Sequence, residues 1–247
     1  MTTVAEIFDM LSELAPTDLA AKWDNVGLLV DAGVAPTSVL FALDITPEVV
    51  EEAAALNCHL IVSHHPVIFN PLRSITPKDV AFQLLSKKIS AICMHTNLDA
   101  ADGGVNDVLA KLIGLQNTIK FAEDCGRIGT VPQTTALAFG EACGRILGAK
   151  VKCIDTARPI ARVAVVGGSG GSYVQEAASL GADLLLTGEA GHHDALDAKR
   201  LGLGLVVAGH YATEFPIVPV LSNRVHEAFP TLKCYISAKE MEPFDYL

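Results

Sequence analysis

The chain has 247 residues, half of which are hydrophobic, and this is enough for a substantial core in one large domain or two small ones. The formal net charge is −10 and no basic cluster extends beyond Lys87-Lys88, which argues against a nucleic-acid-binding surface. The N-terminal residues show no signal-peptide pattern, and no uncharged apolar run reaches the roughly 18 residues that a membrane-spanning helix needs. We therefore expect a soluble, cytoplasmic protein with neither a membrane nor a nucleic-acid partner.

The cysteines also indicate a cytoplasmic protein. The chain has six of them, and none forms a Cys-x-x-Cys pair. Most lie among apolar neighbours, as in Ala91-Ile92-Cys93-Met94, so we interpret them as reduced thiols of a cytosolic protein's core.

Helices and strands alternate in the first part of the chain. Apolar residues recur with helical spacing over residues 3–14, and residues 26–30 and 39–43 are apolar and strand-like. Thr46-Pro47-Glu48 then opens a helix, because Thr caps it, Pro suits its first position and Glu favours the positive end of its dipole. A strand follows at 60–62. This alternation predicts parallel strands and an α/β fold.

The second part of the chain repeats the first. A shift of 124 places, without a gap, aligns residues 39–65 with 163–189 and produces seven identical pairs. A shift of 115 places aligns residues 91–99 with 206–214. We predict two similar α/β halves, residues 1–125 and 126–247, joined by a connector near 125–133 that Gly and Pro residues mark.

Histidines and acids follow three apolar segments of the chain. These residues are His64 and His65 after 60–62, His95 and Asp99 after 89–94, and His210 and Glu214 after 203–208. Open α/β sheets bind ligands at the carboxyl ends of their strands, so the pattern predicts one metal site assembled from distant parts of the sequence. The alternative is that the histidines only end strands and that the other residues are solvated loop residues.

Imidazole and carboxylate ligands suit zinc, iron, manganese or nickel. Two or three histidines with two acids exceed the three protein ligands that an open catalytic zinc normally uses. The surplus suggests two metal ions, roughly 3.5–4 Å apart with a bridging carboxylate, in the cleft between the halves.

Several of these segments resemble signatures of the Nif-three-like family, whose members are often labelled type 2 GTP cyclohydrolase I homologs. The matching motifs are Trp23-Asp24-Asn25-Val26-Gly27-Leu28, Ser63-His64-His65-Pro66, His95-Thr96-Asn97-Leu98-Asp99, Leu186-Thr187-Gly188-Glu189 and Ala208-Gly209-His210-Tyr211-Ala212-Thr213-Glu214. The resemblance implies a two-domain α/β fold, a dinuclear metal site and a ring-shaped homohexamer. The connector is too short for the domain that some relatives insert mid-chain, so this chain resembles the minimal form.

The resemblance also implies which residues hold the metals. The ligands would be His64, His65, Asp99, His210 and Glu214, and His95 would lie at or beside the metals.

Other residues are candidates for catalysis or substrate binding. The run Gly167–Ser172, with Gly168, Ser169 and Gly170, either cradles a phosphate with its N–H groups or forms a tight turn. Glu189 is either a general base or partner of a ligand histidine, or a helix-start acid. Trp23 either walls the cleft or packs in an ordinary way, and His192-His193 is surface-exposed or faces the substrate.

The predicted function is a dinuclear metal-dependent hydrolase acting on a nucleotide-like small molecule, with His95 or Glu189 moving protons. The family label implies attack on C8 of a guanine nucleotide, opening of its imidazole ring and release of formate. The alternative is a metal-storing, metal-delivering or regulatory scaffold with the same ligands, and the residues alone do not choose between them.

Overall fold

The computed structural model describes residues 2–245, and the chain divides into two compact units. The first unit holds residues up to Asp102 together with Ile217–Met241, and the second holds Gly103–Pro216 together with residues from Glu242 onward. The chain is therefore α/β in two parts, as the sequence predicts. Among the described residues, no helix has the length and apolar character required to cross a membrane.

The first unit is built on a five-stranded sheet. Its strands are β1 (Gly27–Val30), β2 (Ser38–Ala42), β3 (Leu60–Ser63), β4 (Ser90–Cys93) and β11 (Lys233–Ile236), in the order β1-β4-β3-β2-β11. All neighbours pair in parallel except β1, which is antiparallel to β4. The residues of β2, β3 and β4 are buried throughout, as expected for parallel strands that are covered on both faces.

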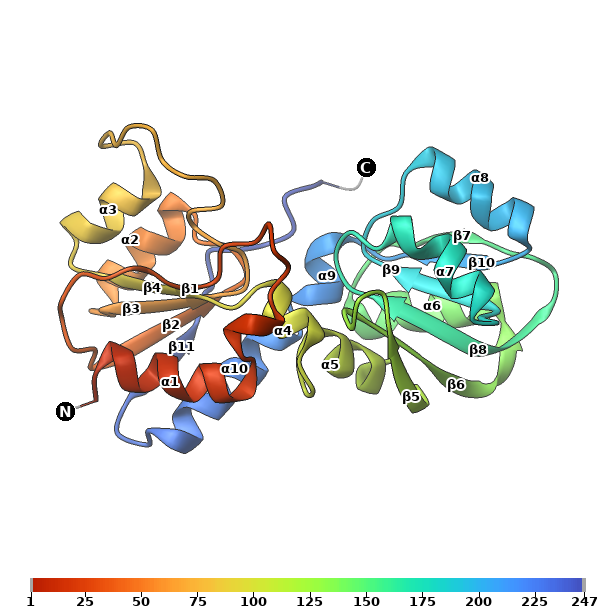
Figure 1. Ribbon diagram of the computed structural model, residues 1–247, viewed down its shortest axis with the longest axis horizontal. Helices are drawn as coiled ribbons and strands as arrows, with labels where there is room; N and C mark the ends of the chain where they lie inside the picture. The colour runs from red at the N-terminus through yellow and green to blue at the C-terminus, as the bar shows by residue number, and fades with distance from the viewer. Residues whose placement is uncertain (1, 246–247) are drawn as a thin grey trace. The chain divides into compact units, whose positions relative to one another are not determined.

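Helices cover both faces of this sheet, with α2 and α3 on one side and α1 and α10 on the other (Figure 1). The helices of the unit are α1 (Val4–Leu14), the 3₁₀ turn η1 (Thr17–Leu19), α2 (Pro47–Ala55), α3 (Val80–Ser86), α4 (Thr96–Ala100) and α10 (Ile217–Ala228). Thr46 caps α2 by accepting a hydrogen bond from the Val49 N–H, with Pro47 at the first helical position. The predicted helix start is confirmed.

The second unit is built on a six-stranded sheet. Its strands are β5 (Gln116–Phe121), β6 (Gly126–Thr135), β7 (Lys152–Ile154), β8 (Pro159–Val166), β9 (Leu184–Thr187) and β10 (Gly204–Val207), in the order β5-β6-β8-β9-β10-β7. The central strands β8, β9 and β10 run parallel, and the other three pair antiparallel. Its helices are α5 (Val105–Leu112), α6 (Ala136–Leu147), η2 (Gly171–Tyr173), α7 (Val174–Ser179), α8 (His192–Leu201) and α9 (His210–Glu214).

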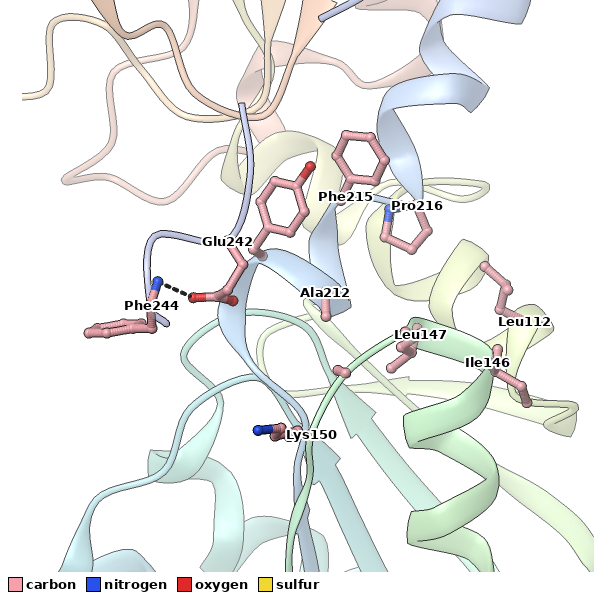
Figure 2. Close-up of a pocket in the computed structure, with 12 residues that line it drawn as sticks. Leu112, Ile146, Leu147, Lys150, Ala212, Phe215, Pro216, Glu242 and Phe244 are labelled. Carbon is pink, nitrogen blue, oxygen red and sulfur yellow. Dashed lines mark hydrogen bonds between the residues drawn. The ribbon is translucent and has the colours of Figure 1, made fainter. Parts of the chain in front are cut away.

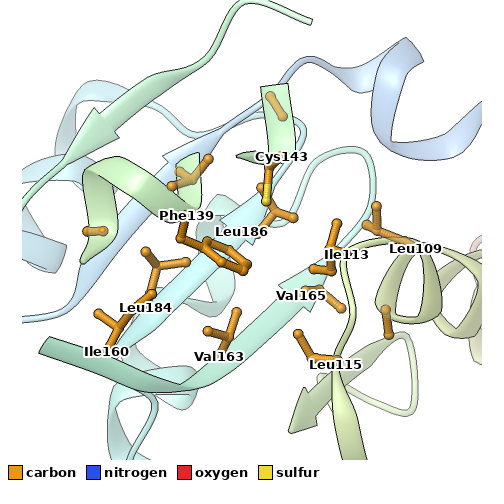
Figure 3. Close-up of a cluster of buried hydrophobic side chains, with 14 residues drawn as sticks. Leu109, Ile113, Leu115, Phe139, Cys143, Ile160, Val163, Val165, Leu184 and Leu186 are labelled. Atoms are coloured by element: carbon orange, nitrogen blue, oxygen red, sulfur yellow. The ribbon is translucent and has the colours of Figure 1, made fainter. Parts of the chain in front are cut away.

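The core of the second unit forms on both faces of its sheet because successive side chains of a strand point to opposite sides. On one face, α5 and α6 pack Leu109 and Phe139 against Val163 and Leu184 (Figure 3). On the other face, α7 and α8 pack against the alternate residues of the same strands, among them Leu185.

The internal repeat is confirmed in its strand–helix–strand part. In both units two parallel neighbouring strands are joined through a helix, β2–α2–β3 in the first and β8–α7–β9 in the second. Val39 pairs with Leu60, and Val163 pairs with Leu184, so the registers match at the predicted offset of 124.

The predicted offset of 115 for the third strand is wrong by one residue. Leu60 pairs with Ser90 and Leu184 pairs with Gly204, so β4 and β10 correspond at an offset of 114. The helices that follow begin at Thr96 and His210, which is the same offset. His210 is therefore the first residue of its helix, whereas His95 is the cap that precedes one, and Gly209 occupies the position equivalent to His95.

Each unit contains one segment from the other half of the sequence. Strand β5 belongs to the second unit because it forms an antiparallel hairpin with β6, and α5 packs in the same core. Strand β11 belongs to the first unit because it pairs with β2. The compact units therefore differ from the predicted halves 1–125 and 126–247 in these two segments.

Candidate metal-binding residues in the two units

Three imidazoles converge at the carboxyl edge of the first unit's sheet. His64 and His65 directly follow β3, and His95 follows the parallel neighbour β4. The ring centroids of these residues are 5.0 Å, 5.2 Å and 5.6 Å apart. One nitrogen from each ring lies within 4.8 Å of the other two, which is close enough for all three to bind a single ion. The carboxyl ends of parallel strands thus bring the residues together as the sequence predicts.

Each of the three rings is oriented through Nδ1. His64 contacts the Met94 carbonyl oxygen at 2.7 Å, His65 contacts Asp44 at 2.9 Å and His95 contacts Asp24 at 2.8 Å. Carbonyl and carboxylate oxygens only accept hydrogen bonds, so Nδ1 carries the proton in each ring. In the neutral tautomer that these contacts favour, Nε2 carries the lone pair, which is the usual arrangement of ligand histidines and their supporting acceptors.

Asp99 adds a carboxylate to this cluster. It lies in the short helix α4, and its Oδ1 is 3.7 Å from Nε2 of the fully buried His64. A cation bound by His64 would therefore lie within reach of Asp99 as well. Of the predicted ligands in the first unit, the structure brings His64, His65 and Asp99 together, and His95 joins them.

Asp24 supports His95 and was not singled out in the sequence. Its buried carboxylate accepts hydrogen bonds from His95 Nδ1 and from the backbone N–H and hydroxyl of Thr96. Burial alone would raise the pKa of Asp24, but these hydrogen bonds outweigh it and hold the pKa well below its usual range. Asp24 is therefore a fixed negative charge behind His95. The sequence signal that could have identified Asp24 is its position next to Trp23, in a motif that resembles the family.

Asp44 supports His65 in the same way, although half of its side chain is exposed. It directly follows the residues 39–43 that the sequence predicts as a strand. The carboxyl-end argument that identified the histidines applies equally to Asp44, so the sequence held a signal for it.

In the second unit, one imidazole lies between two carboxylates. His210 and Glu214 are four residues apart on α9, and His210 Nε2 is 2.9 Å from Glu214 Oε2. His210 Nδ1 is 3.3 Å from Glu189 Oε2. The hydrogen bond to Glu214, with a further contribution from Glu189, outweighs burial and raises the pKa of His210 to about 9. A divalent cation would replace the proton that this arrangement holds.

The glycine run after β8 packs against this group. The N–H of Gly168 donates to the Thr213 hydroxyl at 3.0 Å, and the N–H of Gly170 donates to the Thr187 hydroxyl at 2.9 Å. A Cβ atom at Gly168 would lie 2.0 Å from Glu214 Oε1. These two N–H groups are therefore used within the protein, which removes the predicted role of Gly168 and Gly170 as N–H donors to a phosphate.

Three other residues of the run, Ser169, Gly171 and Ser172, line a polar cavity. Ser169 and Glu189 lie on the wall of a cavity of about 410 Å³, together with Gly171, Ser172, Ala190, Gly191 and Asp194. His192 and His193 follow at the start of α8, with ring centroids 5.6 Å apart. Neither belongs to a possible metal-holding group among the described residues.

A larger and mostly apolar cavity of about 490 Å³ lies in the second unit (Figure 2). Its lining comes from α5, α6, α9 and the C-terminal residues, and its charged members are Lys150 and Glu242. Tyr211 lines this cavity and stacks on Phe215 at 4.9 Å.

These features define an α/β protein of two related units, each with histidine and carboxylate groups at the carboxyl edge of its parallel strands. Residues 2–243 match the family described as Duf34/NIF3 (NGG1p interacting factor 3), and the chain belongs to this family.

Named relatives and a solved structure agree with this assignment. The chain is 31% identical over 258 residues to a GTP cyclohydrolase 1 type 2 homolog of Clostridium perfringens, with 98% of each chain covered. It is 31% identical over 253 residues to NGG1-interacting factor 3 of Saccharomyces cerevisiae, with 83% of each covered. The crystal structure of a Staphylococcus aureus hypothetical protein matches with a TM-score of 0.90 and 31% identity, covering 100% of this chain and 99% of that one.

Proposed function

We propose that this protein is a metal-dependent hydrolase acting on a nucleotide-like substrate. The observation that carries the proposal is the convergence of His64, His65 and His95, each with Nδ1 occupied by an acceptor. Histidines oriented in this way present Nε2 to a divalent cation. The donors are nitrogen and carboxylate oxygen, a set that fits zinc, iron, manganese or nickel.

We propose two metal ions for the whole protein. His64, His65 and Asp99 supply three ligands in the first unit, and His210 and Glu214 supply two more in the second. Five ligands exceed what one open catalytic ion takes, and the surplus supports a second ion. Ions held there would polarise a substrate and lower the pKa of a coordinated water.

Two groups are proposed to carry protons. Asp24 accepts a hydrogen bond from His95 Nδ1, and the other side of the ring lies at or beside the proposed metal ions, where we propose that His95 moves a proton. Glu189 is half exposed, contacts His210 and lines the polar cavity, where it meets solvent and any bound small molecule. A general acid or base must lie within reach of the reacting atoms, and the proposal is supported by the contacts of His95 with His64 and of Glu189 with His210.

The proposed substrate class comes from the family. Relatives bear the name GTP cyclohydrolase 1 type 2 homolog, and hydrolytic opening of a guanine nucleotide is the reaction that the name suggests for this chain. We propose a cytoplasmic location for this activity, which the six free thiols support, because reduced cysteines are usual in a reducing compartment.

The test compares a variant of Glu189 with a matched surface variant. Protein loaded with zinc, iron, manganese or nickel is incubated with GTP, and substrate loss and formate release are measured. Glu189→Gln should lower the rate per bound metal ion by roughly 10²–10⁴-fold, whereas Glu141→Gln, at an exposed site on α6, should not. If no nucleotide is consumed while bound metal passes to an apo-acceptor, the metal-carrier alternative replaces the hydrolase.

A further inference from the structure

Two exposed aromatic side chains lie beside the imidazoles of the first unit. Trp23 is 64% exposed and Phe69 is 46% exposed. Their ring centroids are 5.9 Å apart with the planes inclined at 49°. The His95 ring lies 6.2 Å from Trp23 and 6.4 Å from Phe69, nearly perpendicular to both. We call Trp23 and Phe69 the aromatic wall.

Hydrogen bonds hold the aromatic wall in place. Asn25 Nδ2 donates to the Ile68 carbonyl oxygen at 2.6 Å, which ties the segment of Trp23 to the segment of Phe69. Asp24, next to Trp23, is anchored to His95 and Thr96 at the end of β4. The two rings are therefore not on free loops, because both segments are fixed to each other and to the imidazole cluster.

Packing within the folded chain does not account for the exposure of the Trp23 and Phe69 side chains. Trp is rarely left open to water, and exposed apolar surface that is rimmed by polar groups commonly marks a binding site. Here both open rings contact His95, which is hydrogen-bonded to the Asp24 carboxylate and lies 5.2 Å and 5.6 Å from the rings of His64 and His65.

We propose that Trp23 and Phe69 stack a planar heteroaromatic ring, of the nucleobase type, and hold it beside His95. A planar ring stacked in parallel on one member of the wall would be inclined at 49° to the other, so it would stack on one ring and make a tilted contact with the second; offset stacking is a favoured aromatic geometry. This inference rests on the proposed function in one respect: the stacked ring is taken to be part of the substrate on which the metal centre acts.

The chain offers a direct probe of this contact, because Trp23 is its single tryptophan. The full-length protein is titrated with guanosine, which has the ring but no phosphate, with ribose 5-phosphate, which has no heteroaromatic ring, and with inorganic phosphate. Free N-acetyl-tryptophanamide corrects for non-specific quenching. Guanosine should change the Trp23 fluorescence saturably, with and without added zinc. Ribose 5-phosphate and inorganic phosphate, which have no heteroaromatic ring, should not.

Substitutions locate the contact. Phe69→Leu keeps the tryptophan probe and should weaken guanosine binding by roughly tenfold, as expected for the loss of one stacking partner. Phe82→Leu is the matched control, because Phe82 is an exposed phenylalanine of the same unit on α3. It should bind guanosine as the unsubstituted protein does. Trp23→Leu, followed by equilibrium dialysis, should lose binding to a similar extent, and circular dichroism verifies that each variant folds.

Three outcomes overturn the proposal: no saturable response to guanosine, equal effects of Phe69→Leu and Phe82→Leu, or a response that follows protein concentration instead of guanosine. The last would mean that a second copy of the chain covers the wall. The proposed function fails separately. If guanosine binds but no nucleotide is turned over, the hydrolase proposal is wrong and the stacking proposal stands. If nucleotide is turned over with an unchanged KM in both wall variants, the stacking proposal is wrong and the hydrolase proposal stands.

Discussion

The two units use the same strand–helix–strand scaffold but line its carboxyl edge differently. At the offset of 124, the first unit's Asp44, His64 and His65 correspond to the second unit's Gly168, Gly188 and Glu189. A Cβ atom at Gly188 would lie 2.6 Å from the Thr213 hydroxyl and 2.7 Å from the Gly168 carbonyl oxygen, so no side chain fits there. The first unit fills its edge with imidazoles, whereas the second packs backbone at the same place and lets Glu214 of α9 approach.

The strand ends before this edge are capped differently as well. In the first unit Glu240 accepts hydrogen bonds from the N–H groups of Leu43 and Asp44. The equivalent N–H groups in the second unit, those of Gly167 and Gly168, donate to Asn106 and Thr213. An ionisable cap in one unit thus corresponds to neutral caps in the other. Two copies of the same backbone thus carry different chemistry at the same edge of the sheet.

The largest expected effect comes from removing an imidazole of the first unit. His64→Ala should weaken divalent-metal binding by more than about 100-fold, because loss of a ligand exceeds the 10–100-fold cost of losing a partner of a ligand. Competition with a chromogenic chelator measures this affinity. His226→Ala, at an exposed site on α10, should leave it unchanged, and equal losses in the two variants would contradict the role of His64.

The close approach of Glu214 is tested by adding one methyl group in the second unit. Gly168→Ala places a Cβ against Glu214 at a φ of +58°, and we expect a loss of about 3 kcal/mol of stability from overpacking and backbone strain together. Gly181→Ala is the control, since φ is +77° but nothing lies within 4 Å, and it should cost about 1 kcal/mol. Urea unfolding followed by circular dichroism measures both, and similar values would show that the packing against Glu214 is loose.

The two kinds of strand cap predict a difference in pH dependence. Burial, with repulsion from Asp44, outweighs the backbone hydrogen bonds and raises the pKa of Glu240 to about 7. Between the unfolded value near 4.5 and about 7, the folded state keeps a proton that the unfolded state releases, so stability should fall as pH rises through this window. The full shift corresponds to about 3 kcal/mol, and solvent screening of the partly exposed Glu240 reduces the expected loss to on the order of 2 kcal/mol. Glu240→Gln should flatten this slope in urea unfolding followed by Trp23 fluorescence, and an unchanged slope would place its origin elsewhere.

The smallest expected effect concerns the carboxylates behind the imidazoles. Asp44→Asn should weaken metal binding by roughly tenfold, because His65 loses a charged acceptor that is half exposed to water. Asp24→Asn should cost more, since the Asp24 side chain is fully buried and accepts three hydrogen bonds. The same chelator competition ranks the two variants, and the reverse order would mean that His65 depends more on its support than His95 does.

The sequence by itself determined the α/β class, the repeat over residues 39–65 and 163–189, and the grouping of His64, His65, His95 and Asp99. These features follow from local information: the apolar pattern of each strand, the cap at Thr46, and the rule that parallel strands end at one edge. The partnership of His210 with Glu214 was also local, because four residues span one helical turn.

Only the tertiary structure decided that α5 and β5 belong to the second unit and that α10 and β11 belong to the first. It also decided the support of His95 by Asp24 and the cap that Glu240 places on Leu43. It also decided that the Gly168 and Gly170 N–H groups face protein hydroxyls. Asp24 and His95 are 71 positions apart, and Leu43 and Glu240 are 197 apart. A hydrogen bond across such a separation depends on where the packed core brings the two groups, and no periodicity or spacing along the chain encodes that position.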